Sequence, residues 1–129
     1  MNEVISSLSL KDISTVHARV EDAARTAEFR EQFDFATARA VASLPVLSEY
    51  CLPFVKVGGE FIAYKSEKAD EEVSLSQNAF SVLGGKLKKN VSFVLPGTDY
   101  KRAIIVIKKE TNTPSGYPRK AGTPVKKPL

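Results

Sequence analysis

Stretches of β-branched and apolar residues alternate with charged or alanine-containing stretches along most of this chain. The apolar stretches predict five strands, over residues 13–19, 33–41, 60–64, 91–95 and 103–107. The stretches between them predict three helices, over 22–32, after Ser43, and from Asp70 to Leu83. The order β-α-β-α-β-α-β-β is typical of a parallel sheet with crossover helices, closed here by an antiparallel pair.

Prolines, glycines and a capping serine set the expected ends of these elements. Ser43 can cap a helix and Pro45 suits its first turn, whereas Pro53 predicts the end of that helix or a kink. The pair Gly58-Gly59 predicts a break in the chain before the next strand. The pair Gly84-Gly85 predicts a helix C-terminus.

Composition places the chain among globular proteins. Of its 129 residues, 43% are hydrophobic and 26% charged, which fits one ordinary domain or part of a larger one. The longest apolar run, Ala103–Ile107, predicts a strand covered on both faces and is too short to span a membrane. A single cysteine, Cys51, excludes an internal disulfide and a cysteine-built zinc site. With no secretory signal at the N-terminus, we expect a cytoplasmic protein without a bound metal.

Positive charge is concentrated at the C-terminus. Residues 1–107 carry a net charge of −1, whereas residues 108–129 carry +5. Four of the seven prolines lie beyond residue 110, which favours extended or turned backbone there. We therefore divide the chain into a body, residues 1–110, and a basic tail, residues 111–129, and expect a polyanionic partner.

Seven segments of the chain carry a family resemblance. They are Ala18–Glu21, Phe33-Asp34, Thr37–Leu44, Leu52–Gly59, Leu83–Gly85, Tyr117–Pro124 and Lys126–Leu129. Together they resemble the bacterial ribosomal RNA small subunit methyltransferase G family, also called the glucose-inhibited division protein B family. The resemblance covers essentially the whole chain. The segment around Arg39 and the basic tail are its specific parts, because paired glycines alone would be a weak signal.

The resemblance implies both a fold and an activity. The fold is α/β: the C-terminal part of a class I S-adenosylmethionine-dependent methyltransferase sheet, Rossmann-like, with an antiparallel closing pair. The activity is transfer of a methyl group from S-adenosyl-L-methionine to N7 of a single guanine in 16S ribosomal RNA, so that this RNA or the small ribosomal subunit is the expected partner. Family members carry two further strands and a Gly-rich loop ahead of the matched region. A separate N-terminal fragment is therefore a candidate partner, and the strand from Phe33 should expose an edge.

The resemblance assigns three residues to the cofactor. Val20 and Glu21 follow the strand 13–19, where the family contacts the adenosine, although Glu21 also suits the first turn of a helix. Arg39 lies past the carboxyl end of a strand, where open α/β sheets bind ligands, and its guanidinium suits a carboxylate or phosphate. The alternative for Arg39 is a surface arginine paired with Asp34 or Glu49.

Six cations are candidates for RNA phosphates. Lys65 and Arg102 flank strand ends, and the alternative for both is solvated surface charge. The other four are interleaved with proline and glycine, which suits a stiff strip along a phosphate backbone: Arg119, Lys120, Lys126 and Lys127. The alternative for this tail is a solubilising extension. We predict no catalytic residue, because guanine N7 has a free lone pair and no proton to remove.

Three functional interpretations remain open at this point. The first is the C-terminal portion of the RNA methyltransferase. The second is a non-catalytic remnant that binds RNA through the basic tail but cannot hold the cofactor. The third is a non-functional product of a truncated gene.

Overall fold

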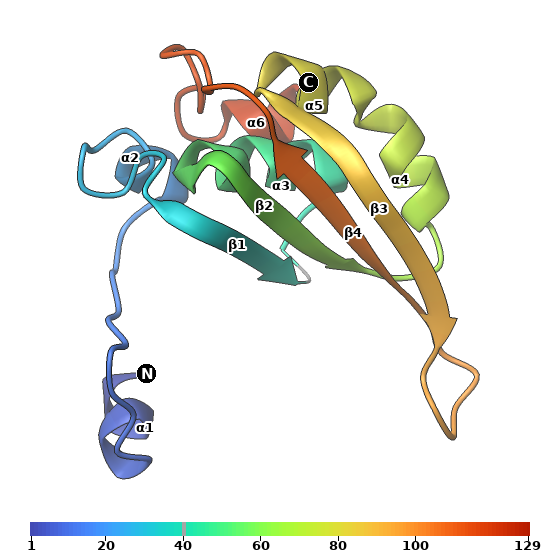
Figure 1. The fold of residues 1–129 in the computed structure, drawn as a ribbon, viewed down its shortest axis with the longest axis horizontal. Coiled ribbons are helices and arrows are strands. Elements are labelled where there is room, and N and C mark those ends of the chain that lie inside the picture. Colours follow the sequence, from blue (N-terminus) through green and yellow to red (C-terminus); the bar gives the residue numbers. More distant parts are fainter. Residues whose placement is uncertain (40) are drawn as a thin grey trace.

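A four-stranded mixed sheet forms the centre of the protein, which we describe from a computed structural model for residues 1–39 and 41–129. Its strands are β1 (Phe33–Arg39), β2 (Val55–Lys65), β3 (Gly85–Val94) and β4 (Lys101–Lys109). They lie in the order β1-β2-β4-β3 (Figure 1). The β1–β2 pair is parallel and the other two pairs are antiparallel, so the predicted antiparallel closing pair is confirmed.

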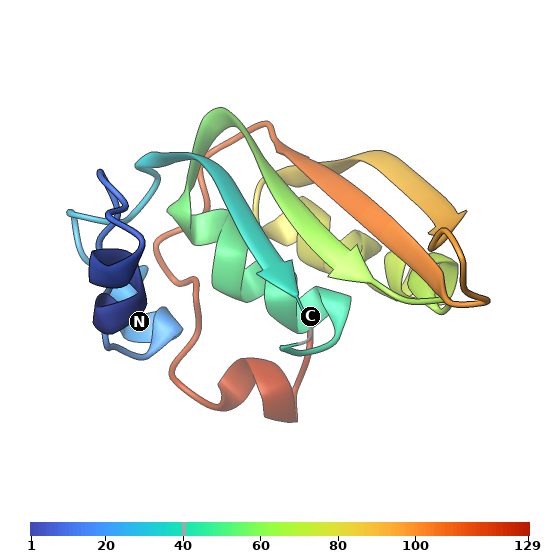
Figure 2. The same cartoon turned by 90° about the horizontal axis from the view of Figure 1, so that it is seen from below.

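Helices cover one side of this sheet. The helical elements are α1 (Asn2–Ser7), α2 (Val20–Ala23), α3 (Leu44–Cys51), the 3-10 turn η1 (Leu52–Phe54), α4 (Ala69–Leu75), α5 (Gln77–Val82) and α6 (Thr123–Lys126). Figure 2 shows α3 to α6 on the same side of the sheet. The buried core lies between these helices and the sheet and includes Leu44, Leu47, Phe61, Phe80 and Ile105.

The start of α3 is capped from a distant part of the chain. Ser43 precedes the helix and Pro45 lies in its first turn, but the Ser43 side chain makes no capping hydrogen bond. Instead, the Leu44 N–H donates to Glu72 Oε2 at 2.7 Å. The helix gives way to η1 around Pro53, so the expected end is confirmed.

Two elements expected near the N-terminus differ from the prediction. Residues 13–19 form no strand, because the described residues offer no strand beside them to complete a ladder. The helix predicted over 22–32 is limited to α2, and turns follow. These turns place the Arg30 side chain against backbone carbonyls of residues 113–117, so tertiary bonds override local helix propensity.

The pair Gly58-Gly59 does not break the chain, contrary to the prediction. β2 runs through both glycines, and the β1–β2 register shifts there, so that Phe33 pairs with Val55 and Phe35 with Glu60. Gly58 adopts a φ of +89°, and a Cβ on Gly59 would lie 2.5 Å from the Asp34 carbonyl oxygen. The glycines therefore permit an irregularity within a continuous strand.

The acidic helix predicted from Asp70 is divided in two. α4 ends at Leu75 and α5 begins at Gln77, and the Ser76 hydroxyl between them donates to the Glu72 carbonyl at 2.6 Å. Leu75 is consequently exposed, whereas Ala79 and Leu83 are buried. The chain turns at Gly84 with a φ of +80°, which confirms the predicted helix end.

Strand β4 is not covered on both faces as its sequence predicts. Ala103, Ile105 and Ile107 are buried, whereas the alternating residues Ile104 and Val106 are only partly buried. Figure 2 shows the helices of residues 41–129 on one side of the sheet, and among the described residues no helix covers the other face of this strand.

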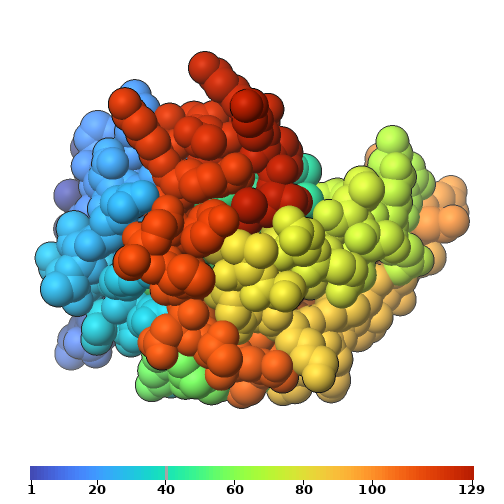
Figure 3. Space-filling view, turned by 90° about the horizontal axis from the view of Figure 1, so that it is seen from above, coloured from blue at the N-terminus to red at the C-terminus, as the bar shows by residue number. Residues whose placement is uncertain are grey.

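The basic tail folds back onto the body. Residues 111–122 are irregular and lead into α6, and Thr113, Pro118 and Pro124 are buried. Figure 3 shows this segment lying between the N-terminal residues and the α4–α5 segment. The sequence analysis considered a stiff strip along RNA and a solubilising extension, and neither interpretation included packing of the tail onto the body. Among residues 1–39 and 41–129, no helix is long and apolar enough to cross a membrane.

Candidate functional site

A basic cavity lies at the ends of the two parallel strands. Arg39 is the last residue of β1, Lys65 is the last residue of β2, and Arg102 is the second residue of β4. The cavity has a volume of about 330 Å³ and is lined by Arg39, Tyr64, Lys65, Ser66, Glu72 and Arg102. We call it the cation pocket. Its position matches the expectation that ligands bind at the carboxyl ends of parallel strands.

Lys65 is anchored within the cation pocket. Its Nζ lies 2.7 Å from Glu72 Oε2 and donates to the Ala42 carbonyl at 3.0 Å. The Lys65 side chain is 11% exposed, so a freely solvated surface charge is the wrong description for it. Because Glu72 Oε2 also accepts the Leu44 N–H, one carboxylate connects Lys65 to the start of α3.

Arg39 and Arg102 add positive charge to the cation pocket. Arg39 pairs in register with Tyr64, and the Arg102 guanidinium carbon lies 5.4 Å from the centroid of the Tyr100 ring. The alternative partners expected for Arg39 are occupied elsewhere, Asp34 by Lys56 at 2.5 Å and Glu49 by a tail arginine. With three cations against one carboxylate, the pocket suits a phosphate or carboxylate.

Val20 lies at the opposite end of β1 from Arg39. It lines an apolar cavity of about 360 Å³ that also includes Phe29, Phe33 and Phe54. Phe33 begins β1 and Arg39 ends it, so the two sites are about 20 Å apart at the usual rise of a strand. Figure 1 shows α2 near the start of β1. The sequence analysis expected Val20, Glu21 and Arg39 to contact the same cofactor. The structure places Val20 and Arg39 in different cavities.

Glu21 faces the tail. Its side chain is mostly buried, and Oε1 accepts the Gly122 N–H at 3.2 Å. Burial and the nearby negative charge of Glu21 raise the pKa of Tyr50. Glu21 thus occupies the first turn of α2, as the alternative interpretation expected. Val20, Glu21 and Arg39 do not fit a single S-adenosylmethionine site within this chain.

The four tail cations divide into two kinds. Arg119 donates from Nε and Nη2 to the two carboxylate oxygens of Glu49, at 2.9 and 2.6 Å. Lys120, Lys126 and Lys127 are exposed. Arg119 therefore holds the tail onto the body, while the three lysines remain accessible to a polyanion.

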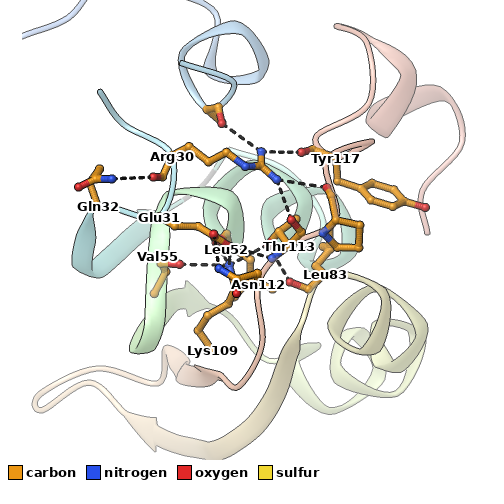
Figure 4. Close-up of polar contacts among 12 residues, drawn as sticks. Arg30, Glu31, Gln32, Leu52, Val55, Leu83, Lys109, Asn112, Thr113 and Tyr117 are labelled. Carbon is orange, nitrogen blue, oxygen red and sulfur yellow. Dashed lines mark hydrogen bonds and ion pairs between the residues drawn. The ribbon is translucent and has the colours of Figure 1, made fainter. Parts of the chain in front are cut away.

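Sequence reasoning missed the network around Lys109, which it counted only among the positive charges of residues 108–129. The Lys109 side chain is fully buried, and its Nζ donates to the Leu52 carbonyl and the Thr113 hydroxyl, both at 2.7 Å (Figure 4). It also lies 3.0 Å from Glu31 Oε1. The sequence held one signal of this burial. Lys109 follows Ala103, Ile105 and Ile107 at every second position of the strand, and residues with this spacing point to the same face, here toward the core.

The described residues contain no group of three or more histidine, cysteine or acidic side chains placed to hold a metal ion. Cys51 packs against the core, and burial raises the pKa of its thiol to about 12. A thiol with this pKa is almost entirely protonated at neutral pH and is a poor nucleophile.

Comparisons with known proteins match one family throughout. A family model described as rRNA small subunit methyltransferase G matches residues 1–104. The ribosomal RNA small subunit methyltransferase G of Acetivibrio thermocellus is 58% identical over 129 residues, which are 100% of this chain and 53% of the relative. The proteins of the same name from Lachnoclostridium phytofermentans and Clostridium perfringens strain SM101 are 52% and 50% identical over 129 residues, covering all of this chain and 53% and 54% of those relatives. The chain thus spans about half the length of the curated relatives it matches, and the predicted resemblance is confirmed.

Proposed function

Because this chain belongs to the rRNA small subunit methyltransferase G family, we propose that it supplies the RNA-facing half of a methyltransferase. The complete enzyme would transfer a methyl group from S-adenosyl-L-methionine to N7 of one guanine in 16S ribosomal RNA. Its substrate would be this RNA, free or within the small ribosomal subunit, in the cytoplasm. The observation that carries the proposal is the cation pocket, where Arg39, Lys65 and Arg102 come together.

The cation pocket would bind phosphate and position the RNA. Two arginines can each present a planar fork of N–H donors to phosphate oxygens, and Lys65 adds a point charge held in place by Glu72. Phosphate contacts fix the register of an RNA without reading its sequence. Choice of the guanine would therefore depend on other contacts.

The proposed chemistry asks little of side chains. Guanine N7 carries an in-plane lone pair and no proton, so its methylation needs no general base. Alignment of the reactants can contribute up to about 7–11 kcal/mol in favourable systems. This is in keeping with a pocket that holds cations and Glu72, whose carboxylate is occupied by Lys65 and the Leu44 N–H.

A second candidate function is a non-catalytic RNA-binding protein. The position of Val20 and Glu21 near the start of β1, away from Arg39 at its end, favours it, because within the described residues these three expected cofactor residues lie in different cavities. Both candidates require RNA binding by the cation pocket. They differ in whether the half of the family domain that this chain does not match is also present.

RNA binding by the double variant R39Q/R102Q tests the function shared by both candidates. We expect weaker binding of a 16S RNA fragment and a shallower dependence on salt than for the unmodified protein. The matched control is K11Q/K68Q, which removes the same charge from two exposed positions outside the cation pocket. Equal losses in the two variants would show that only net charge matters and would contradict a phosphate site in the pocket.

A further inference from the structure

Strands β3 and β4 form a strongly basic hairpin that the charge balance along the sequence did not single out. Residues 85–109 carry seven lysine or arginine side chains and one acidic side chain, Asp99. Lys109 is buried, and Glu60 lies 2.5 Å from Lys88 Nζ and 3.8 Å from Lys108 Nζ. The other four cations include three exposed lysines and one half-buried arginine: Lys86, Lys89, Lys101 and Arg102. The hairpin therefore offers positive charge to a polyanion.

The tip of this hairpin lies at the same end of the sheet as the cation pocket. Lys65, the last residue of β2, pairs with Ala103, and Ala103 pairs with Ser92, so residues 93–102 extend past the end of β2. Figure 1 shows the tip projecting beyond β1 and β2. Arg102 lines the cation pocket and also a cavity of about 350 Å³ beside the hairpin. The tip and the cation pocket are therefore adjoining surfaces.

Tyr100 presents an exposed aromatic ring at this tip. It is 63% exposed, and the Arg102 guanidinium carbon lies over the ring, 5.4 Å from its centroid. The guanidinium occupies one face of the ring, which leaves the other face to stack on a planar partner. The turn holds the backbone of Tyr100 in place, because its carbonyl accepts the Leu95 N–H at 3.0 Å and its N–H donates to the Thr98 hydroxyl at 3.2 Å.

Protection of a sheet edge explains only part of this composition. β3 is an edge strand, and lysines on an edge strand oppose pairing with another chain, which accounts for Lys86, Lys88 and Lys89. Tyr100 lies in the turn, and Arg102 lies on β4, which has a neighbouring strand on each side. A large exposed ring with a cation over it does not protect an edge, so this pair calls for a different explanation.

We propose that the β3–β4 hairpin binds a single-stranded segment of RNA, with one base stacked on Tyr100 and the adjoining phosphates contacted by Lys101 and Arg102. Stacking on an aromatic side chain accepts any base, and the cations attract the phosphates. The RNA must be single-stranded at this point, because the bases of a duplex are stacked on one another and are not free to reach the ring. The choice of RNA as the ligand rests on the proposed function, whereas the assignment to the hairpin rests on the contacts of Tyr100.

The charge of the hairpin favours RNA over a polypeptide. An apolar protein partner would bury Lys101 and Arg102 without a counter-charge, which is costly, whereas RNA supplies a phosphate at every nucleotide. Arg102 contacts the Tyr100 ring and lines the cation pocket, so a strand stacked at the tip can continue into the pocket. The hairpin would thus give the RNA a second point of attachment beside the phosphate site.

Tryptophan fluorescence tests the stacking directly, because the chain contains no tryptophan. Y100W keeps an aromatic ring at the tip and supplies a single reporter. A short single-stranded RNA oligonucleotide should quench its emission, whereas inorganic polyphosphate, which carries the charge but no bases, should not. The matched control is V57W, which places the reporter at a 48% exposed position near the start of β2, and neither ligand should change its emission.

Binding measurements separate stacking from charge. Y100A should weaken binding of the single-stranded oligonucleotide by about fivefold to a hundredfold, and Y100F should bind normally. Neither variant should change binding of a blunt RNA duplex of the same sequence. Circular dichroism confirms that each variant is folded, which we expect because Tyr100 is exposed.

R39Q separates this inference from the proposed function, because it changes the cation pocket and leaves the hairpin intact. Normal binding by Y100A, or emission of Y100W that the oligonucleotide leaves unchanged, would overturn the hairpin site. Normal binding by R39Q would instead contradict the cation pocket. Failure of the unmodified chain to bind single-stranded RNA would overturn both.

Discussion

Arg119 and Glu49 form a bidentate ion pair that fixes the basic tail to α3. The Arg119 backbone N–H also donates to Glu49 Oε1, at 2.7 Å, so that carboxylate accepts three groups from one residue. The Glu49 side chain is 1% exposed, whereas that of Arg119 is 25% exposed. Moving Arg119 onto an RNA phosphate would leave Glu49 as a buried unpaired charge. Arg119, one of the four tail cations expected to contact RNA, therefore has a structural role in this chain.

Loss of this pair should destabilise the fold. R119A leaves the Glu49 carboxylate buried without its partner, and breaking such a pair costs about 3–5 kcal/mol when both groups are buried. The partial exposure of Arg119 reduces the expected loss to about 2 kcal/mol. Urea unfolding measures it against K120A, an exposed neighbour that should change the free energy of unfolding by less than about 0.5 kcal/mol. Equal effects of the two substitutions would contradict a stabilising role for the Arg119–Glu49 pair.

The accessible tail lysines should account for the salt dependence of RNA binding that the tail contributes. Each phosphate neutralised on a single strand adds about 0.7 to the slope of the logarithm of the binding constant against the logarithm of the salt concentration. The variant K120A/K126A/K127A should therefore flatten that slope by up to about 2. R119A should leave the slope nearly unchanged. A salt series with a 16S RNA fragment measures both variants. A larger change for R119A than for the triple variant would show that Arg119 reaches phosphate.

Lys109 should contribute strongly to stability. K109M keeps the length of the side chain but leaves Glu31 and the Leu52 carbonyl without their buried donor, which should cost about 2–5 kcal/mol. The matched control is K108M on the same strand, since Lys108 is partly exposed and points to the other face. Urea unfolding of both variants provides the measurement. A K109M protein as stable as K108M would show that the network contributes little.

The same network predicts a loss of stability in acid. Partial burial opposes ionisation of Glu31, but hydrogen bonds from Asn112, Thr113 and Lys109 outweigh it and lower its pKa below 4.5. The unfolded chain therefore takes up this proton first as the pH falls. The stabilisation is present above about pH 4.5 and is lost as pH falls through the folded-state pKa. The melting temperature of E31Q should fall less steeply than that of the unmodified protein as the pH is lowered across this range. Identical pH profiles for the two proteins would contradict the prediction.

Local patterns predicted the sheet well because each strand is defined by its own residues and its immediate neighbours. β1 and β4 appear where β-branched and aromatic residues cluster, and the closing pair follows from the short connection between β3 and β4. The strand expected over 13–19 does not form, since a strand also needs a partner and no described residue supplies one. A run of strand-favouring residues does not indicate whether a partner strand is present.

The candidate site was only partly predictable, for a related reason. The topology of β1, β2 and β4 brings Arg39, Lys65 and Arg102 together, and strand ends were a usable signal for each of them. The pairing of Arg119 with Glu49 joins residues 70 positions apart, and no local pattern encodes it. Charge counting treated Arg119 and Lys109 as free cations, although ion pairs with Glu49 and Glu31 commit both of them to the fold.

The measurement that tests the central claim most directly is methylation of 16S ribosomal RNA by a fusion of this chain to the unmatched half of the Acetivibrio thermocellus relative. Mass spectrometry of the digested RNA should detect 7-methylguanosine at one position. R39K should reduce the rate by about tenfold or more, because lysine cannot reproduce the planar fork of donors, whereas R19K, an exposed control, should not. Thermal melts are measured alongside to confirm that both variants are folded. A folded fusion that makes no 7-methylguanosine, or one in which R39K methylates at the normal rate, would contradict the account.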